Sequence, residues 1–356
     1  MLTRFIFNSR NKWCYIGVAI LVIFCIFIYI IPSGNGKVKN YEVDIFDLFN
    51  REPNQLANLN ITCRDSPLDK YNCYSLSTSR LANRFPRILI IGFGKAGTRA
   101  LLNFLHLHPS ITGPPVEVNY FDKYYDKESL QSYLETFPPI NENISNIEKS
   151  PSYIISPGTP YRLSSVISAL DIPKESIKLI VLMRDPLERA VSEYLEWVIQ
   201  RTREFQSLSS FDEMVFNSET LPKFITTSEY DIHVSSWLKY FPLEQFCFVD
   251  GDLFIEDPFP VLQELEICLG IKAHYKRTDF VFDHGKGFFC VNDENSIQCL
   301  GKSKGRIHPE IEEETRKYLR KHFKSHNLRL EKLIHKEFTW ARKDKNILKR
   351  FLSKVF

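Results

Sequence analysis

Short apolar runs alternate with amphipathic segments through most of the chain. Three runs rich in β-branched residues, at 87–93, 177–183 and 245–249, predict buried strands. Other segments carry apolar residues at helical spacing, and they predict helices at 98–106, 186–200, 258–269, 309–322 and 328–338. Strands that alternate with helices are typical of α/β proteins. We therefore expect a mainly parallel sheet that helices flank on both faces.

A longer apolar run, residues 13–31, has a different character. It contains no charged residue and is long enough to cross a membrane. Arg4, Arg10 and Lys12 precede it and no acidic residue does, which predicts a cytoplasmic tail at 1–12 and a signal anchor at 13–31. A cleaved signal peptide is the alternative, although no small-x-small cleavage site follows the run. Residues 32–80 are polar and aperiodic, as in a stem, and 81–356 form the predicted folded body.

Composition narrows the class of protein only a little. The 356 residues allow one large domain or two small ones, and 44% hydrophobic content is ample for a core. A net charge of +3 is too small to indicate nucleic acid as a partner. The triplets that begin at Asn60 and Asn143 are glycosylation acceptors, which agrees with a body in a secretory compartment.

Six of the eight cysteines lie outside the apolar run and its flank. In an oxidising compartment some of them should pair. Cys290 and Cys299 would close a short loop and are the preferred pair, with Cys63–Cys73 as a second candidate. The pairing of Cys247 and Cys268 stays open, and Cys268 could simply be buried on a helix. No Cys or His spacing indicates a zinc site.

The most informative segment is the glycine-rich turn after the first strand, in residues 87–104. The turn carries Lys95, Thr98 and Arg99, and a helix begins directly after it. Backbone N–H groups and the helix dipole at such a place favour an anion, so the turn predicts a phosphate-binding site. Its glycine spacing departs from the standard P-loop, and a plain strand–helix connection is the alternative.

Three further clusters strengthen the case for an anionic ligand. Arg184 ends the second strand beside a helix start, which suits a phosphate, although surface ion pairs with neighbouring acids are the alternative. A second cluster covers residues 148–153. The last, residues 286–309, places a basic loop before a helix. Within it, Phe288 or Phe289 could stack on an adenine ring or simply pack in the core.

Together these motifs resemble the Golgi heparan sulfate sulfotransferases, most closely the glucosaminyl 3-O-sulfotransferases. The likeness covers about residues 85–340 and rests on four motifs in order: GKAGTRAL, EKSPSY, RDPLERAVSEY, and KGFFC followed by CLGKSKGRIHP. It implies a P-loop nucleotide-kinase-like sulfotransferase fold and a single-pass type II protein of the Golgi membrane. It also implies sulfonate transfer from 3′-phosphoadenosine 5′-phosphosulfate (PAPS) to heparan sulfate, with no metal and no nucleic acid.

The resemblance also implies residue roles. The nucleotide-binding residues would come from the turn, the second strand end and the basic loop: Lys95, Ala96, Gly97, Thr98, Arg99, Arg184, Ser192, Phe289, Lys304, Gly305, Arg306, Ile307 and His308. The saccharide would contact Arg99, Glu117, Asp122, Lys149, Glu196, Lys304 and Arg306. Cys290 and Cys299 match the family's disulfide.

The resemblance places the catalytic base at Glu117. A sugar hydroxyl is a poor nucleophile, so a carboxylate must accept its proton during attack, while Lys95 and Lys149 stabilise the developing charge. Close relatives carry histidine where this chain has Asn119. That departure leaves open a non-catalytic heparan-binding protein, and the motif after Cys299 leaves open a sister N- or 6-O-sulfotransferase activity. The glycine-rich turn alone would also suit a nucleotide kinase.

Overall fold

A parallel sheet of five strands forms the centre of the part of the chain that the computed structural model describes, which is residues 81–341 without 142, 203–208, 218, 294–295 and 300–309. The strand order is β2-β3-β1-β4-β5. The strands are β1 Ile88–Gly92, β2 Ile111–Thr112, β3 Ser145–Lys149, β4 Lys178–Met183 and β5 Phe246–Asp250. The predicted mainly parallel sheet is thus confirmed, and β1, β4 and β5 match the three predicted strands.

The sequence did not predict β2 and β3. Strand β3 has the polar sequence SNIEK, yet it pairs with the central strand, with Ile90 opposite Lys149. Its last residues, Glu148 and Lys149, are buried although both carry ionisable side chains. Apolar periodicity cannot detect such a strand, because partner groups rather than apolar character make its burial possible.

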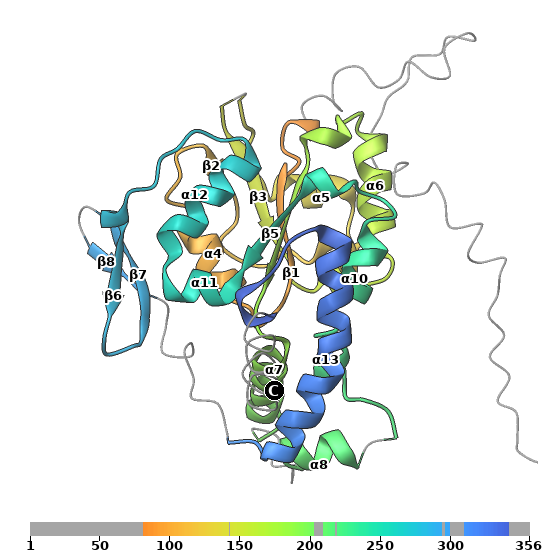
Figure 1. The fold of residues 1–356 in the computed structure, drawn as a ribbon. Coiled ribbons are helices and arrows are strands. Elements are labelled where there is room, and N and C mark those ends of the chain that lie inside the picture. The colour runs from red at the N-terminus through yellow and green to blue at the C-terminus, as the bar shows by residue number, and fades with distance from the viewer. Residues whose placement is uncertain are drawn as a thin grey trace, which may run out of the picture. The chain divides into compact units, whose positions relative to one another are not determined.

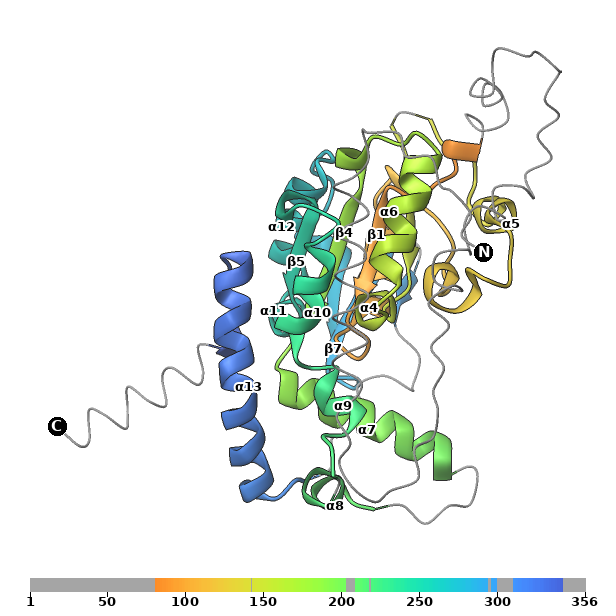
Figure 2. The same ribbon diagram turned by 90° about the vertical axis from the view of Figure 1, so that its right-hand side faces the viewer.

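Helices lie on both faces of the sheet. In the view of Figure 1, α4, α11 and α12 lie to its left and α6 and α10 to its right. Figure 2 is turned so that this right-hand side faces the viewer, with α6 in front of β1. The α-helices are α4 Thr98–Leu105, α5 Leu130–Glu135, α6 Thr159–Ala169, α7 Pro186–Thr202, α8 Phe211–Phe216, α9 Lys223–Thr226, α10 Tyr230–Trp237, α11 Gly251–Glu256, α12 Pro258–Leu269 and α13 Glu313–Ile334. Short helical turns lie at Tyr120–Tyr124, Tyr153–Ile155, Lys174–Ser176, Leu243–Gln245 and Arg277–Asp279.

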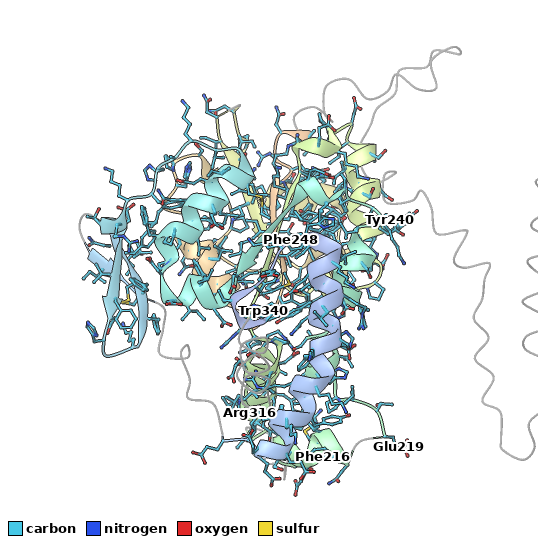
Figure 3. The ribbon with its side chains drawn as sticks, in the orientation of Figure 1. Phe216, Glu219, Tyr240, Phe248, Arg316 and Trp340 are labelled. Atoms are coloured by element: carbon cyan, nitrogen blue, oxygen red, sulfur yellow. A yellow bond between two sulfur atoms is a disulfide. The ribbon has the colours of Figure 1, made fainter. Side chains whose placement is uncertain are left out.

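The C-terminal helix corrects one prediction. Instead of two helices that end and begin around residues 322–328, α13 runs without a break from Glu313 to Ile334. Phe323, Asn327 and Leu330 are buried on one face, so packing continues across the weak helix formers near Asn327. At its start the helix lies beside α8, where the rings of Phe216 and Tyr318 are 5.5 Å apart, in the region of Figure 3 labelled Phe216 and Arg316.

A small antiparallel sheet, which the sequence did not predict, stands beside the main one. Its strands are β6 Phe280–Asp283, β7 Phe288–Asp293 and β8 Ser296–Gln298. A disulfide joins Cys290 on β7 to Cys299, which confirms the preferred pair. A second disulfide joins Cys247 on β5 to Cys268 on α12, so Cys268 is bonded rather than merely buried.

Several predictions lie outside the described residues. They are the tail, the signal anchor, the stem, the acceptor Asn60, the candidate pair Cys63–Cys73 and the basic loop of residues 304–308. In the described ranges, no helix combines the length and apolar character that a membrane span requires. The other acceptor, Asn143, is exposed in the turn that precedes β3.

Candidate active site

The turn between β1 and α4 is shaped by its backbone. Gly97 has φ 107°, a left-handed conformation that glycine adopts at little cost, and Lys95 is also left-handed at φ 70°. Gly97 caps α4, and no side chain among the described residues takes over that capping role. The first backbone N–H groups and the positive end of the helix dipole therefore lie where an anion can bind.

A buried arginine supports this turn from behind. Arg189 on α7 is 1% exposed, and its Nη1 donates to the carbonyl oxygen of Gly94 at 3.3 Å. Its Nε donates to Ser228 Oγ at 2.6 Å, and Nη2 donates to Phe224 O and to Glu193 Oε2, both at 2.6 Å. Arg189 therefore links α7 to the turn at Gly94 and to the segment from Phe224 to Ser228, and its ion pair with Glu193 starts from a buried guanidinium.

Three basic side chains leave the sheet at one edge. Lys95 follows β1, Lys149 ends β3 and Arg184 follows β4. Since β1 lies between β3 and β4 and all three strands are parallel, their carboxyl ends meet at the same edge. The outer two strands are two strand spacings apart, about 10 Å. Ligands of open α/β sheets bind at this edge, so the topology alone gathers the predicted cations.

Arg184 has a buried N–H donor without a hydrogen bond in the described part of the chain, here called its orphaned donor. Its Nε is buried and finds no hydrogen-bond partner among the described residues, and it lies 3.8 Å from Asp252 Oδ1. A Cβ atom on Gly251 would lie 2.8 Å from Met183 O and 3.0 Å from Ala96 O, so the end of β4 and the phosphate turn meet at this glycine. Buried donors without partners are costly, and a bound anion would satisfy this one.

Glu117 and Lys149 form the second half of the site. Lys149 Nζ donates to Glu117 Oε1 at 2.7 Å, and the two residues also form an isolated parallel bridge. The lysine side chain is 2% exposed, whereas that of Glu117 is 42% exposed. The carboxylate is therefore open to a substrate while a buried cation sets its direction, unlike a fully solvated loop carboxylate.

Beneath this pair lies a buried carboxyl that the sequence did not single out for a role. Glu148 accepts hydrogen bonds from Tyr133 OH at 2.5 Å, from Ser150 Oγ at 2.9 Å and from Tyr153 OH. Burial raises the pKa of Glu148 to about 7, against the opposing effect of these hydroxyl donors. The sequence signal that could have indicated its burial was a glutamate in a polar segment with tyrosines nearby in the chain.

The same network holds the segment that carries the candidate base. Asn119 N donates to Ser150 Oγ at 2.8 Å, and Phe121 N donates to Tyr153 OH at 3.1 Å. Asn119 is left-handed at φ 55°, and its Oδ1 accepts from Ser152 Oγ at 3.1 Å. Glu148 thus reaches the backbone on the C-terminal side of Glu117 through two hydroxyls, and Asn119 is part of that connection.

Several known proteins are similar to this chain. The family model described as the sulfotransferase domain matches residues 85–339. Human heparan sulfate glucosamine 3-O-sulfotransferase 3B1 is 34% identical over 285 residues, 78% of this chain and 69% of that protein. The human 3-O-sulfotransferase 5 is 34% identical over 268 residues, 73% of this chain and 75% of that protein. The chain belongs to the heparan sulfate glucosamine 3-O-sulfotransferase family. A sulfotransferase from Alicyclobacillus acidocaldarius has a similar fold, with TM-score 0.52 and 22% identity over 72% of this chain and 99% of that one.

In this sulfotransferase, two residues expected at the saccharide have specific surroundings. Lys95 Nζ lies 3.3 Å from Glu196 Oε2 on α7, and both side chains are partly exposed. Asp122 lies in the helical turn Tyr120–Tyr124, and its buried Oδ1 has no hydrogen-bond partner among the described residues. Of these two carboxylates, Glu196 is the one that forms an ion pair with a predicted site residue within the described part of the chain.

Two expected nucleotide contacts lie farther along the chain. Phe289 is half-buried on β7, where its ring lies 5.2 Å from that of Phe282, so it packs against the small sheet. Ser192 is half-buried on α7, in the helix that Arg184 precedes. The remaining ones, Lys304 to His308, fall outside the described residues. The sulfotransferase site described here therefore comprises the turn, the end of β3 with Glu117, and the end of β4.

Proposed function

We propose that this sulfotransferase moves a sulfonate from PAPS to the 3-hydroxyl of glucosamine residues in heparan sulfate, with Glu117 as the general base. One observation carries the proposal. The pair of Glu117 and buried Lys149 stands at the same sheet edge as the anion-binding turn at Lys95 and the orphaned donor of Arg184. The relatives 3B1 and 5 are named for this substrate and position.

The donor would bind across the sheet edge. Backbone N–H groups of residues 95–99, with Lys95 and Arg99, suit the 5′-phosphosulfate, because a helix N-terminus and lysine both favour phosphate. Arg184 suits the 3′-phosphate, since its Nε is buried without a hydrogen bond in the described part of the chain. Ser192, Phe289 and residues 304–308 complete the proposed nucleotide contacts.

The transfer itself needs a base and a place for charge. Glu117 takes the proton of the sugar 3-hydroxyl as that oxygen attacks sulfur. The bond between sulfur and the bridging phosphate oxygen breaks, and adenosine 3′,5′-bisphosphate (PAP) leaves with the electron pair. Lys95 and Lys149 stabilise the negative charge on the sulfonate and on the leaving oxygen. Asp122 and Glu196 would contact the saccharide.

Product mapping tests the proposal. Labelled PAPS is supplied with N-sulfated heparan sulfate, and the labelled position is identified after depolymerisation. Label on the 3-hydroxyl is the expected result. Label on nitrogen or on the 6-hydroxyl would replace the 3-O assignment with a sister activity. Saccharide and PAP binding without any transfer would contradict the enzymatic proposal and leave a heparan-binding protein.

We also propose the type II arrangement in the Golgi membrane, with residues 13–31 as the anchor and the body in the lumen. Supporting it are the uncharged run, the basic residues before it and the exposed acceptor Asn143. Protease protection in sealed vesicles tests it. The body should be protected and carry an endoglycosidase-sensitive glycan, and digestion of the body in intact vesicles would contradict the arrangement.

A further inference from the structure

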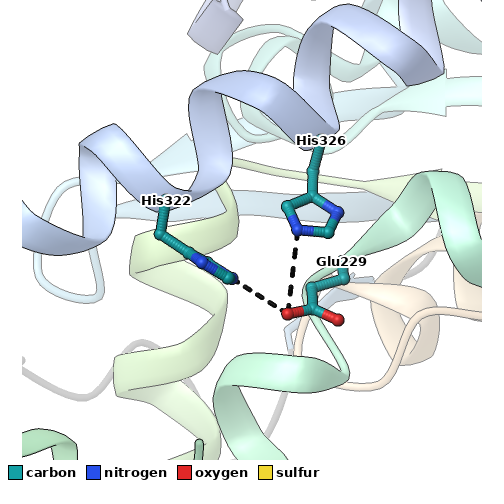
Figure 4. A group of neighbouring side chains, drawn as sticks. All are labelled: Glu229, His322 and His326. Atoms are coloured by element: carbon teal, nitrogen blue, oxygen red, sulfur yellow. Dashed lines mark hydrogen bonds and ion pairs between the residues drawn. The ribbon is translucent and has the colours of Figure 1, made fainter.

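Two histidines of α13 and a glutamate before α10 converge away from the candidate active site. His322 Nε2 lies 2.9 Å from Glu229 Oε1, and His326 Nε2 lies 3.8 Å from the same oxygen. One ligand atom from each of the three lies within 4.8 Å of the others. Figure 4 shows both imidazole rings directed from α13 toward the carboxylate of Glu229.

This cluster could not be predicted from the sequence, because the predicted helices separated its histidines. A helix break predicted between residues 322 and 328 separates His322 from His326, and no zinc-like spacing is then visible. Because α13 is continuous, the two residues are one turn apart and their side chains lie on the same face. Glu229 lies 93 positions earlier, at the N-cap of α10, so only the packing of α13 against α10 brings it near.

The surroundings orient one of the rings. His326 Nδ1 lies 2.6 Å from Asp231 Oδ1 and 2.9 Å from Arg329 Nη2, and Arg329 Nε donates to Asp231 Oδ2 at 2.6 Å. Since Asp231 is paired with the guanidinium, it acts as an acceptor, and its contact with Nδ1, the shorter of the two, assigns the ring proton to Nδ1. A neutral His326 then presents the Nε2 lone pair to the side of Glu229. A carboxylate on the far nitrogen is the usual outer partner of a metal-binding histidine.

We propose that Glu229, His322 and His326 bind one divalent transition-metal ion, with zinc the best fit. Two imidazole nitrogens and one carboxylate oxygen are a common zinc ligand set, and they leave a fourth position for water. Ligand atoms around a tetrahedral zinc lie about 3.3 Å apart. The separations of 2.9 and 3.8 Å fall on either side of that value. A network of ion pairs between charged histidines and the acids is the alternative.

The position of this site points to a structural role. Its ligands join α13 to the short segment between α9 and α10. In that segment Ser228 accepts from Arg189, which supports the turn after β1. Tyr230, the first residue of α10, donates from its OH to Arg184 O at 3.0 Å. A metal ion would therefore fasten the C-terminal helix to the backbone behind the nucleotide site, without contact to the reacting groups. This inference does not depend on the proposed reaction.

Metal titration of the purified, tag-free full chain tests the site. After treatment with a chelator and its removal, Zn²⁺ at about 100 times its dissociation constant should raise Tm by roughly 5–10 °C. Co²⁺ should bind at one ion per chain and give the strong visible absorption of a four-coordinate centre. His322→Gln, His326→Gln and Glu229→Gln should each abolish the Tm shift and the absorption.

His335→Gln is the matched control. It removes an exposed imidazole at the C-terminal end of the same helix, and it should keep both the shift and the absorption. The parent chain must show the one-to-one absorption whether or not every variant folds. The proposal is overturned if the parent shows neither signal, as the ion-pair alternative predicts. It is equally overturned if the three ligand variants respond to metal as the parent does, because the ion would then bind elsewhere.

Discussion

The phosphate turn and the end of β3 each bring a lysine to the same sheet edge, but they are built in different ways. The turn depends on backbone conformation at Lys95 and Gly97, and one buried arginine supports it from outside. The end of β3 depends on side chains, because Glu148 and three hydroxyls hold the strand and the segment after Glu117. Because the two regions are built differently, we expect that one substitution can weaken PAPS binding without displacing the base, and another can remove the base without weakening PAPS binding.

The largest expected effect is a loss of turnover without a loss of nucleotide binding, which distinguishes the two regions. Glu117→Gln removes the base but keeps an oxygen that can accept from Lys149. We expect kcat to fall by about 10³-fold, within the range for loss of a general base, with an unchanged Kd for PAP. Rate assays under saturating PAPS and calorimetric titration with PAP measure the two quantities. Near-normal turnover would show that another group accepts the proton.

The second-largest expected effect is a loss of stability when the arginine that supports the turn is replaced. Arg189→Leu leaves Glu193, Ser228 and two carbonyl oxygens without their donor, so the free energy of unfolding should fall by about 3–5 kcal/mol. Denaturant titration measures it. Arg277→Leu is the control, since Arg277 is 66% exposed and pairs with Asp257 at the surface, and it should cost less than about 1 kcal/mol. Equal losses in both variants would contradict the supporting role of Arg189.

The buried carboxyl at the end of β3 should make the free energy of unfolding depend on pH. The pKa of Glu148 is about 7 in the folded chain against a reference value of 4.5. Between these values the folded state retains a proton that the unfolded state has lost. The free energy of unfolding should therefore fall as pH rises from about 4.5 to about 7, by on the order of 3 kcal/mol, and this contribution should be constant above that range.

Glu148→Gln is the variant that isolates this contribution. An amide does not titrate, so the slope that Glu148 adds between about pH 5 and pH 7 should disappear from the stability curve. Denaturant titrations at half-unit pH intervals compare the variant with the parent. An unchanged slope would mean that another group is responsible for it.

The smallest expected effect is on nucleotide binding alone. Arg184→Ala should weaken PAP binding by about 10- to 100-fold, because a charge-assisted hydrogen bond contributes about 1.5–3 kcal/mol. Stability should change little, since the Arg184 Nε has no hydrogen bond among the described residues and its ion pair with Asp252 is a long one at 3.8 Å. Calorimetry with PAP and a thermal melt give both values. Unchanged affinity would remove Arg184 from the nucleotide site and leave the turn as the only tested anchor.

How far the sequence predicts this site differs between its parts. Strands β1, β4 and β5 could be predicted because a parallel sheet covered on both faces needs continuous apolar runs. A glycine-rich turn with basic residues likewise indicated the proposed phosphate site from local sequence. Strand β3 was not readable, since Glu148 and Lys149 are buried by virtue of partners elsewhere in the chain. The role of Arg189 was missed for the same reason. Its acceptors, Ser228 and Phe224, lie more than 30 positions away.

By itself the sequence determined three strands of the main sheet, the helices α4, α7 and α12, the glycine-rich basic turn and the family. These follow from local spacing of apolar, glycine and basic residues within single segments. Only the tertiary structure decided which charges meet. Glu117 meets Lys149 because the chain that follows β2 continues alongside β3. Glu229 meets His322 and His326 because α13 is continuous and packs on α10. Distant pairs of this kind leave no periodicity in the chain, since burial and packing, rather than local propensity, bring them together.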